Sequence, residues 1–208
     1  MLLVAAPAAL ADVSVSINLQ PAEAQFGQAT KITGRVLSEY VPLPNQRVEL
    51  DVRRYPFDSP FAPLDRTRTA ADGTYTFTSK LGRNAQFRVL AGDAKSPRAR
   101  AFVFPATTLS YRARSVRVIR LVQRYRVPKR VHLRQPTIFY VGKRGRTTAP
   151  RVATGKLVRT RPGRYTSTAT YRLPKSWHGR FKYASCFRYT AGSGMGNPRA
   201  SCPRRFRF

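Results

Sequence analysis

The stretch Arg47-Val48-Glu49-Leu50-Asp51-Val52-Arg53 decides the fold class of this chain. Val48, Leu50 and Val52 alternate with charged residues, so an extended backbone places the apolar side chains on one face and the charged ones on the other. A helix would need apolar residues about every three to four positions, and residues 12–105 nowhere sustain that pattern. The stretch therefore predicts a β-strand with one buried face.

Similar strands are expected on both sides of this one. They are Val13–Leu19, Lys31–Leu37, Asp65–Thr69, Thr74–Ser79, Gln86–Ala91 and Arg98–Phe104. Turn-forming residues separate them, and the pair Asp72-Gly73 predicts a hairpin turn because glycine takes positive φ without steric cost. Short strands with regular punctuation predict an antiparallel β-sandwich over residues 12–105.

Several segments of this region follow one order: Ile32-Thr33-Gly34-Arg35-Val36, Leu43–Leu50, Thr69–Phe77 and Phe87-Arg88-Val89. That order resembles the bacterial Ig-like and carboxypeptidase-regulatory-like (transthyretin-like) domains of secreted proteins, over residues 30–104. The resemblance implies an Ig-like β-sandwich that serves as a spacer, adhesion module or accessory domain. That group shares no catalytic residues, so none is expected here.

Residues 106–208 differ sharply in charge from the first half. They carry 26 Lys and Arg and no Asp or Glu, whereas all nine carboxylates of the chain lie at or before Asp93. The net charge of +30 favours polyanionic partners and opposes self-association. Arginine outnumbers lysine by 31 to 8. GC-rich codon usage explains that choice equally well, but it does not explain 115 residues without a carboxylate.

The basic half also has the pattern of strands. After a short junction at Ala106-Thr107-Thr108, the expected strands are Val116–Val127, Pro136–Gly142, Val152–Arg159 and Arg164–Leu173. The last two would form a hairpin around Arg161-Pro162-Gly163. These strands predict a second antiparallel β-sandwich in tandem with the first, so the whole chain is expected to be all-β.

Two of these strands would present basic faces. In an unbroken strand, Arg120, Arg124 and Arg126 lie on the side opposite Ile119, Leu121 and Tyr125. Arg164 and Arg172 similarly share a face with three threonines. An aromatic row at period two, Phe181, Tyr183, Phe187 and Tyr189, is expected to be core rather than an exposed stacking platform.

The N-terminal residues 1–11 are expected to be a signal peptide. Residues 1–10 are apolar, and Ala9-Leu10-Ala11 fits a small-x-small cleavage site before Asp12. The basic leading segment is missing, so Met1 is expected to lie inside a longer signal peptide; the alternative is a short apolar tail on a cytosolic protein. No later stretch is apolar enough to span a bilayer. The expected location is extracellular, in association with the cell wall.

The run from Arg180 to Cys202 contains both cysteines of the chain, Cys186 and Cys202. In an oxidising compartment this pair predicts one disulfide, and no metal site is expected because the thiols lack partners at ligand spacing. The run resembles the C-terminal half of actinobacterial secreted proteins, which implies a compartment and no activity.

The sequence offers little support for a catalytic function. The basic half has no carboxylate for acid–base work, and His132 and His178 are the only histidines. Cys186 as a nucleophile is less favoured than the disulfide. The run Gly192–Gly196 lacks the context of a phosphate-binding loop and is expected to be a flexible hairpin tip. We therefore expect a protein without catalysis and without a cofactor.

Binding functions remain. The first is a structural or binding module that holds anionic envelope polymers or acidic polysaccharide by charge and bidentate hydrogen bonds. The residues expected to bind the anion are Arg120, Arg124, Arg126, Arg144, Arg146, Arg161, Arg164 and Arg172. The second is extracellular nucleic-acid binding through phosphate contacts. The third is a soluble protein-interaction module whose charge has no specific ligand.

Overall fold

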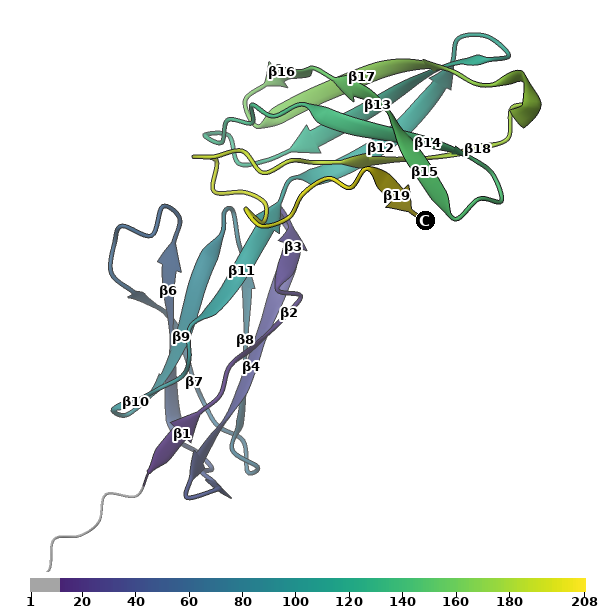
Figure 1. Cartoon of the computed structure of the whole chain (residues 1–208). Coiled ribbons are helices and arrows are strands. Elements are labelled where there is room, and N and C mark those ends of the chain that lie inside the picture. The colour runs from purple at the N-terminus through teal and green to yellow at the C-terminus, as the bar shows by residue number, and fades with distance from the viewer. Residues whose placement is uncertain (1–11) are drawn as a thin grey trace, which may run out of the picture. The chain divides into compact units, whose positions relative to one another are not determined.

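The computed structural model describes residues 12–208, so the expected signal peptide at residues 1–11 lies outside the described residues. The described chain consists of strands and one short 3-10 turn, η1 (Lys175–Trp177), without an α-helix (Figure 1). The prediction of an all-β chain is therefore confirmed. Within residues 12–208, no helix has the length and apolar character needed to cross a membrane.

The chain divides into two compact units. The first contains the described residues up to Ala22, with Thr30–Ser79 and Ala85–Ala101; the second contains Glu23–Ala29, Lys80–Asn84 and Phe102–Phe208. Three short segments from the first half of the sequence thus belong to the second unit.

The strands of the first half form two sheets. Their bounds are β1 (Val13–Val15), β2 (Asn18–Gln20), β3 (Glu23–Gln25), β4 (Ala29–Ser38), β5 (Val41–Pro42), β6 (Arg47–Arg54), β7 (Ala62–Arg68), β8 (Thr74–Lys80), β9 (Ala85–Ala91), β10 (Ala94–Lys95) and β11 (Ala99–Phe104). One sheet has the order β1-β4-β2, with β5 and β8 also on β4; the other has the order β3-β11-β9-β6-β7, with β10 on β9. β3 pairs with β11 in the parallel direction, which the expectation of antiparallel strands did not include.

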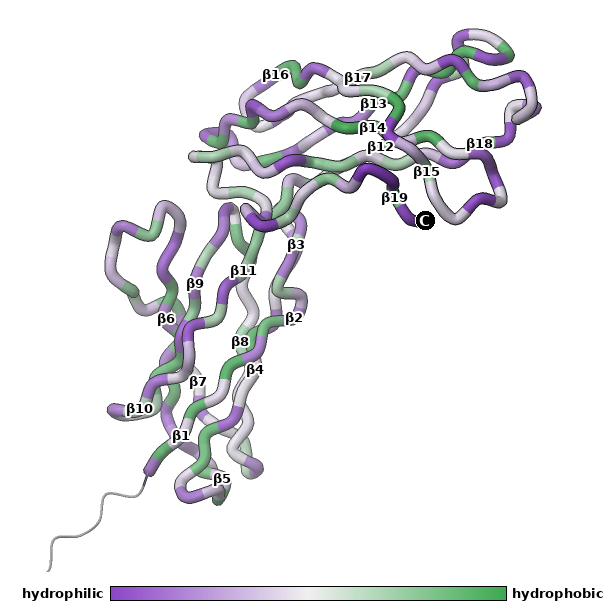
Figure 2. The backbone as a smooth tube through the Cα atoms, viewed as in Figure 1, coloured by the Kyte–Doolittle hydropathy of each residue, from purple (hydrophilic) through white to green (hydrophobic). Residues whose placement is uncertain are grey.

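The alternation that predicted β6 positions its side chains as expected. Val48, Leu50 and Val52 are all buried, and Figure 2 shows hydrophobic and hydrophilic residues following one another along most strands. Asp51 departs from the pattern, because it lies on the charged face and yet is only 3% exposed. Its neighbour across the sheet, Arg88, covers it and donates two hydrogen bonds to it.

The second unit holds two four-stranded sheets. Its strands are β12 (Ala106–Ala113), β13 (Val118–Arg126), β14 (Thr137–Lys143), β15 (Thr148–Gly155), β16 (Leu157–Arg161), β17 (Arg164–Arg172), β18 (Phe181–Cys186) and β19 (Arg205–Arg207). The sheets have the orders β12-β13-β17-β16 and β18-β14-β15-β19. Ile119 and Leu121 of β13 form one buried cluster with Phe139 and Val141 of β14, so side chains of both sheets share a core.

Two details of the second half differ from the expectation. Residues 106–108, expected as a junction, begin strand β12, which pairs with β13 along its whole length. The expected strand Val152–Arg159 is divided at Lys156 between β15 and β16, which belong to different sheets. At the point of division Gly155 is packed against the core, since a Cβ there would lie 2.7 Å from Phe139 Cε2 and 2.8 Å from the Thr168 carbonyl oxygen.

Two predicted turns are present, and both need glycine. Gly73 has a φ of +74° in the turn that leads into β8, but β7 and β8 lie in different sheets, so the turn is present and the hairpin predicted from the Asp72-Gly73 pair is not. Gly163 has a φ of +73° between β16 and β17, and a Cβ on it would approach the Val127 carbonyl oxygen to 2.5 Å. Any other residue would be strained at these positions.

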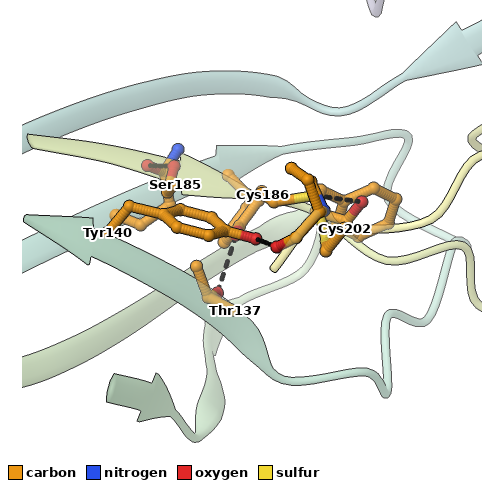
Figure 3. Close-up of a disulfide and its surroundings, with 9 residues drawn as sticks. Thr137, Tyr140, Ser185, Cys186 and Cys202 are labelled. Carbon is orange, nitrogen blue, oxygen red and sulfur yellow. Dashed lines mark hydrogen bonds between the residues drawn. A yellow bond between two sulfur atoms is a disulfide. The ribbon is translucent and has the colours of Figure 1, made fainter. Parts of the chain in front are cut away.

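The predicted disulfide joins Cys186, at the end of β18, to Cys202, with a Cα–Cα distance of 5.7 Å. Figure 3 shows Tyr140 beside it, and the Tyr140 hydroxyl donates to the Pro203 carbonyl oxygen at 2.6 Å. The loop that the disulfide closes is not a flexible tip. Ser193 and Met195 are buried, and the Gly196 amide donates to the Val103 carbonyl oxygen at 2.8 Å, because the loop folds back against its own unit.

Candidate anion-binding face

The sheet β12-β13-β17-β16 collects basic side chains on the face opposite its core. Strand β13 is unbroken from Val118 to Arg126, so Arg120, Arg124 and Arg126 share one face, as its alternation predicted. The antiparallel register sets Arg126 opposite Arg164 and Arg124 opposite Thr166 of β17. The two basic strand faces found in the sequence are thus adjacent and form one surface.

The neighbouring strands extend this surface. β12 brings Arg112 opposite Arg120 and Thr108 opposite Arg124. On the other side, the register between β16 and β17 shifts after Arg159, which sets Arg161, and not Thr160, opposite Arg164. Such a bulge changes the direction of a side chain, and here it adds a third arginine to the Arg126–Arg164 row.

The surface is hollowed next to β16. This β16-side hollow has a volume of about 600 Å³. Its lining includes four arginines and four threonines: Arg124, Arg126, Arg161, Arg164, Thr107, Thr108, Thr160 and Thr166. All these groups can donate a hydrogen bond to an anion.

A second hollow lies further along β13, beside the Arg112 end of β12. This β12-side hollow, of about 320 Å³, is lined by Arg112, Arg114, Arg120 and Arg124 with Val122 and two threonines. Arg124 and Thr166 line both hollows, so the two are adjacent on one sheet.

The arginines of this face have no counterion within the described chain. None of the seven side chains, Arg112, Arg114, Arg120, Arg124, Arg126, Arg161 and Arg164, makes an ion pair or a hydrogen bond with residues 12–208. The first unit is the opposite case, since Arg35, Arg66 and Arg88 each pair with a carboxylate. Like charges on neighbouring strands repel one another, and a bound anion would remove that repulsion.

The structure brings together only part of the predicted anion-binding set. Arg120, Arg124, Arg126, Arg161 and Arg164 line the two hollows. Arg172 lies on the same strand as Arg164 but lines neither hollow. Arg144 and Arg146 lie in the turn between β14 and β15, which belong to the other sheet of the unit.

Sequence reasoning missed Arg112 and Arg114, because residues 106–108 were expected to be a junction and the strand that follows them was not recognised. The signal was nevertheless present in the sequence. Thr108, Ser110 and Arg112 alternate with Leu109 and Tyr111, which is the same period of two that identified β13.

A third hollow has one carboxylate, Glu23, and no basic residue in its lining. Its volume is about 420 Å³, and Thr107 and Tyr125 line it as well as the β16-side hollow. Burial raises the pKa of Tyr125 to about 12, although the hydrogen bond with Thr137 opposes this shift. The Tyr125 hydroxyl lies 2.7 Å from the Thr137 hydroxyl. Tyr125 is uncharged at neutral pH, as a tyrosine of ordinary pKa would also be, and does not weaken the positive field beside it.

The other candidate sites in the sequence were the two histidines, a metal site and the aromatic row. His132 Nε2 lies 3.2 Å from Arg159 Nη1, and His178 is an exposed residue at the end of η1. Across residues 12–208, no group of three or more His, Cys, Asp and Glu side chains is placed to hold a metal ion. Phe181 and Tyr183, from the aromatic row expected to be core, are half-buried and pack against the buried cluster of β13 and β14, whereas Phe187 and Tyr189 lie beyond the end of β18.

Comparison with known proteins gives no family for the chain. No protein-family model and no curated protein matches it.

Proposed function

We propose that the protein is a secreted, non-catalytic binding protein whose second unit holds anionic polymers of the cell envelope. One observation carries the proposal: seven arginines without an internal partner share one face of the β12-β13-β17-β16 sheet and line two adjoining hollows. A surface of this kind attracts polyanions at long range and binds them with charge-assisted hydrogen bonds at short range.

In this proposal the two units are β-sandwich domains in tandem, the first of them Ig-like or transthyretin-like. Two sheets with a shared buried cluster support this for the second unit. The alternating strands and their arrangement in two sheets support it for the first. The first unit has its own charge pairs, so we assign it the role of a spacer or accessory domain and the second the role of binding.

The extracellular location is supported by the disulfide Cys186–Cys202, since such bonds persist in oxidising compartments. The apolar residues 1–10 and the small-x-small pattern at residues 9–11 support export. Outside the membrane, the available polyanions are envelope polymers, with extracellular DNA as the competing ligand.

The test is retention of residues 12–208 on purified bacterial cell envelope across a salt series. We expect retention at physiological ionic strength that falls steeply as salt rises. The variant Arg124→Gln/Arg164→Gln should weaken binding about a hundredfold, because it removes two charge-assisted contacts from the face, each worth about tenfold. The variant Arg144→Gln/Arg146→Gln removes the same charge from the other sheet and should retain nearly the parent affinity.

Three results would contradict the proposal. Equal losses in the two variants would mean that net charge acts without a site. Absence of retention at low salt would leave the charge with a role in solubility alone. Displacement of the bound protein by low concentrations of DNA would identify nucleic acid as the better ligand.

A further inference from the structure

The basic face has a direction. Along β13, Arg126, Arg124 and Arg120 project from the same side, and the interval of two residues between the first pair corresponds to about 6.6 Å. The six-residue interval from Arg126 to Arg120 corresponds to about 20 Å. The cations thus follow one another along a strand and are not gathered around one point.

Each position along this line has partners on the neighbouring strands. Arg126 lies in a row with Arg164, and Arg120 lies in a row with Arg112. Between them, Arg124 lies opposite Thr108 on one side and Thr166 on the other. An anion at any of these positions would meet donors from at least two strands.

The position without an arginine is Val122. Ser110 and Thr168 lie opposite it, so this row still offers two hydroxyl groups. Val122 is only 7% exposed although it lies on the outer face. Side chains of adjacent rows therefore cover it, and the aliphatic stems of long cationic residues commonly cover apolar surface in this way.

The two hollows overlap at Arg124 and Thr166, which places one recess at each end of the line with a shared centre. A single small anion would occupy only one of them. A flexible single chain with repeated charges fills both.

We propose that the basic face binds one extended chain of phosphodiester groups that runs along β13, from the Arg126–Arg164 row to the Arg120–Arg112 row. This inference rests on the proposed function and names the chemistry of its ligand. Successive phosphates would lie about one two-residue strand interval apart, which is a spacing that extended phosphodiester chains reach. A phosphodiester has two free oxygens on opposite sides of the chain, so one group can accept from Arg124 and from the Thr166 hydroxyl together.

The experiment measures the affinity of residues 12–208 for probes of increasing length and for two sources of the same chemistry. The probes are inorganic phosphate, linear poly(glycerol phosphate) and oligothymidylate, the last two from about two to about ten phosphates long. Polygalacturonate is the carboxylate probe. Each affinity is measured over a salt series by fluorescence anisotropy of a labelled chain, or by competition with it.

We expect the affinity per binding site to rise with length and to level off at about four phosphates, when both hollows are filled. With about four phosphate contacts, the logarithm of affinity should fall with the logarithm of salt at a slope of about −2.8. Arg124→Gln should lower the affinity about tenfold and make the slope shallower by about 0.7. Arg144→Gln, as the matched control, should leave both unchanged. Arg124→Lys keeps the charge and loses the planar fork, so it should keep the slope and lose affinity.

The poly(glycerol phosphate) and oligothymidylate arms separate the sources. Equal affinity at equal length would support a face that reads the phosphate chain alone; much tighter binding of oligothymidylate would overturn this by showing that bases take part. Affinity that keeps rising in proportion to length, or equal losses in Arg124→Gln and Arg144→Gln, would also overturn the inference. Tighter binding of polygalacturonate than of the phosphate chains would show that the face prefers carboxylates, and it would overturn the phosphate chemistry of the inference. If every phosphate probe fails while envelope retention still depends on Arg124, only the ligand class is wrong; if both fail, the proposed function falls as well.

Discussion

Loss of Arg88 should destabilise the first unit far more than loss of Arg66, although both arginines pair with a carboxylate of β6. Arg88 donates through Nε and Nη2 to Asp51 Oδ2 at 2.9 and 2.8 Å, and the Asp51 side chain is 4% exposed. Arg66 lies 2.6 Å from Glu49 Oε2, but these side chains are 56% and 23% exposed. Distance alone would rank the second pair higher. Burial reverses that order.

The expected losses of stability depend on how buried the unpaired carboxylate is in each variant. Arg88→Met leaves a buried carboxylate without its counterion, and the second oxygen, Asp51 Oδ1, already has no hydrogen-bond partner within the described chain. Breaking a buried pair in this way costs about 3–5 kcal/mol. Arg66→Met leaves Glu49 accessible to water, so its cost should be about 0–1 kcal/mol. The lower end of the first range applies, because the Arg88 side chain is itself 28% exposed.

A double variant distinguishes two causes of the destabilisation: the lost contact between Arg88 and Asp51, and the charge of Asp51 that is left buried without a counterion. Asp51→Leu/Arg88→Met removes both charges, and replacement of a buried pair by apolar residues is often nearly neutral. The double variant should therefore recover most of the stability that Arg88→Met loses. The guanidinium of Arg88 also lies 4.5 Å from the centre of the Phe61 ring, and the double variant does not restore that contact, so recovery should stop short of the parent by about 1 kcal/mol.

The assay is urea unfolding followed by two signals. Trp177 is the only tryptophan of the chain and packs against the core of the second unit, so its fluorescence reports that unit. Far-ultraviolet circular dichroism reports both units. Arg88→Met should move the first unit's transition by about 2–3 M urea and leave the tryptophan midpoint in place. Equal small effects of Arg88→Met and Arg66→Met, or a double variant no more stable than Arg88→Met, would refute the reasoning from burial.

Three further outcomes follow from the second unit. Cys186→Ser/Cys202→Ser should lower its free energy of unfolding by about 3 kcal/mol, because the loop between residues separated by 16 positions is no longer closed; reductant should have the same effect on the parent and none on the variant. Gly155→Ala should lower the free energy of unfolding by about 1–3 kcal/mol in thermal or urea unfolding, since its Cβ would lie 2.7 Å from Phe139 Cε2. Gly82→Ala is the control: its Cβ would lie 3.4 Å from the nearest atom, so it should be nearly neutral. Burial raises the pKa of Tyr125 to about 12, so the unfolded state loses the phenol proton at lower pH than the folded state. The contribution of Tyr125 to the free energy of unfolding should be complete below pH ~10 and should fall by about 2–3 kcal/mol up to pH ~12. The free energy of unfolding should fall less over this range in Tyr125→Phe.

Local patterns predicted the strands well where one side was buried. The alternation of Val48, Leu50 and Val52 located β6, and that of Ile119, Leu121 and Tyr125 located β13 together with its basic face. The same pattern failed at residues 152–159, because Lys156 ends one strand and the next strand joins a different sheet. Nothing in a run of residues shows which sheet will take each half of it.

The sequence predicted that the candidate site consists of arginines, but it identified only some of those arginines. The absence of carboxylates from residues 94–208 predicted a basic surface that favours polyanionic partners. It did not separate Arg144 and Arg146, in a turn of the other sheet, from Arg161, which a register shift places beside Arg164. Arg112 entered the site through the pairing of β12 with β13.

The sequence by itself determined the all-β class, the single disulfide and the one-sided charge, because each depends on residue type and on neighbours close in the chain. Only the tertiary structure decided which basic strands lie side by side, that β3 pairs with β11, and that Asp51 is buried beneath Arg88. The physical reason is that strand pairing joins residues distant in sequence through backbone hydrogen bonds, which are the same for every residue type. The choice of neighbour therefore follows from how the whole set of strands buries its apolar faces at once.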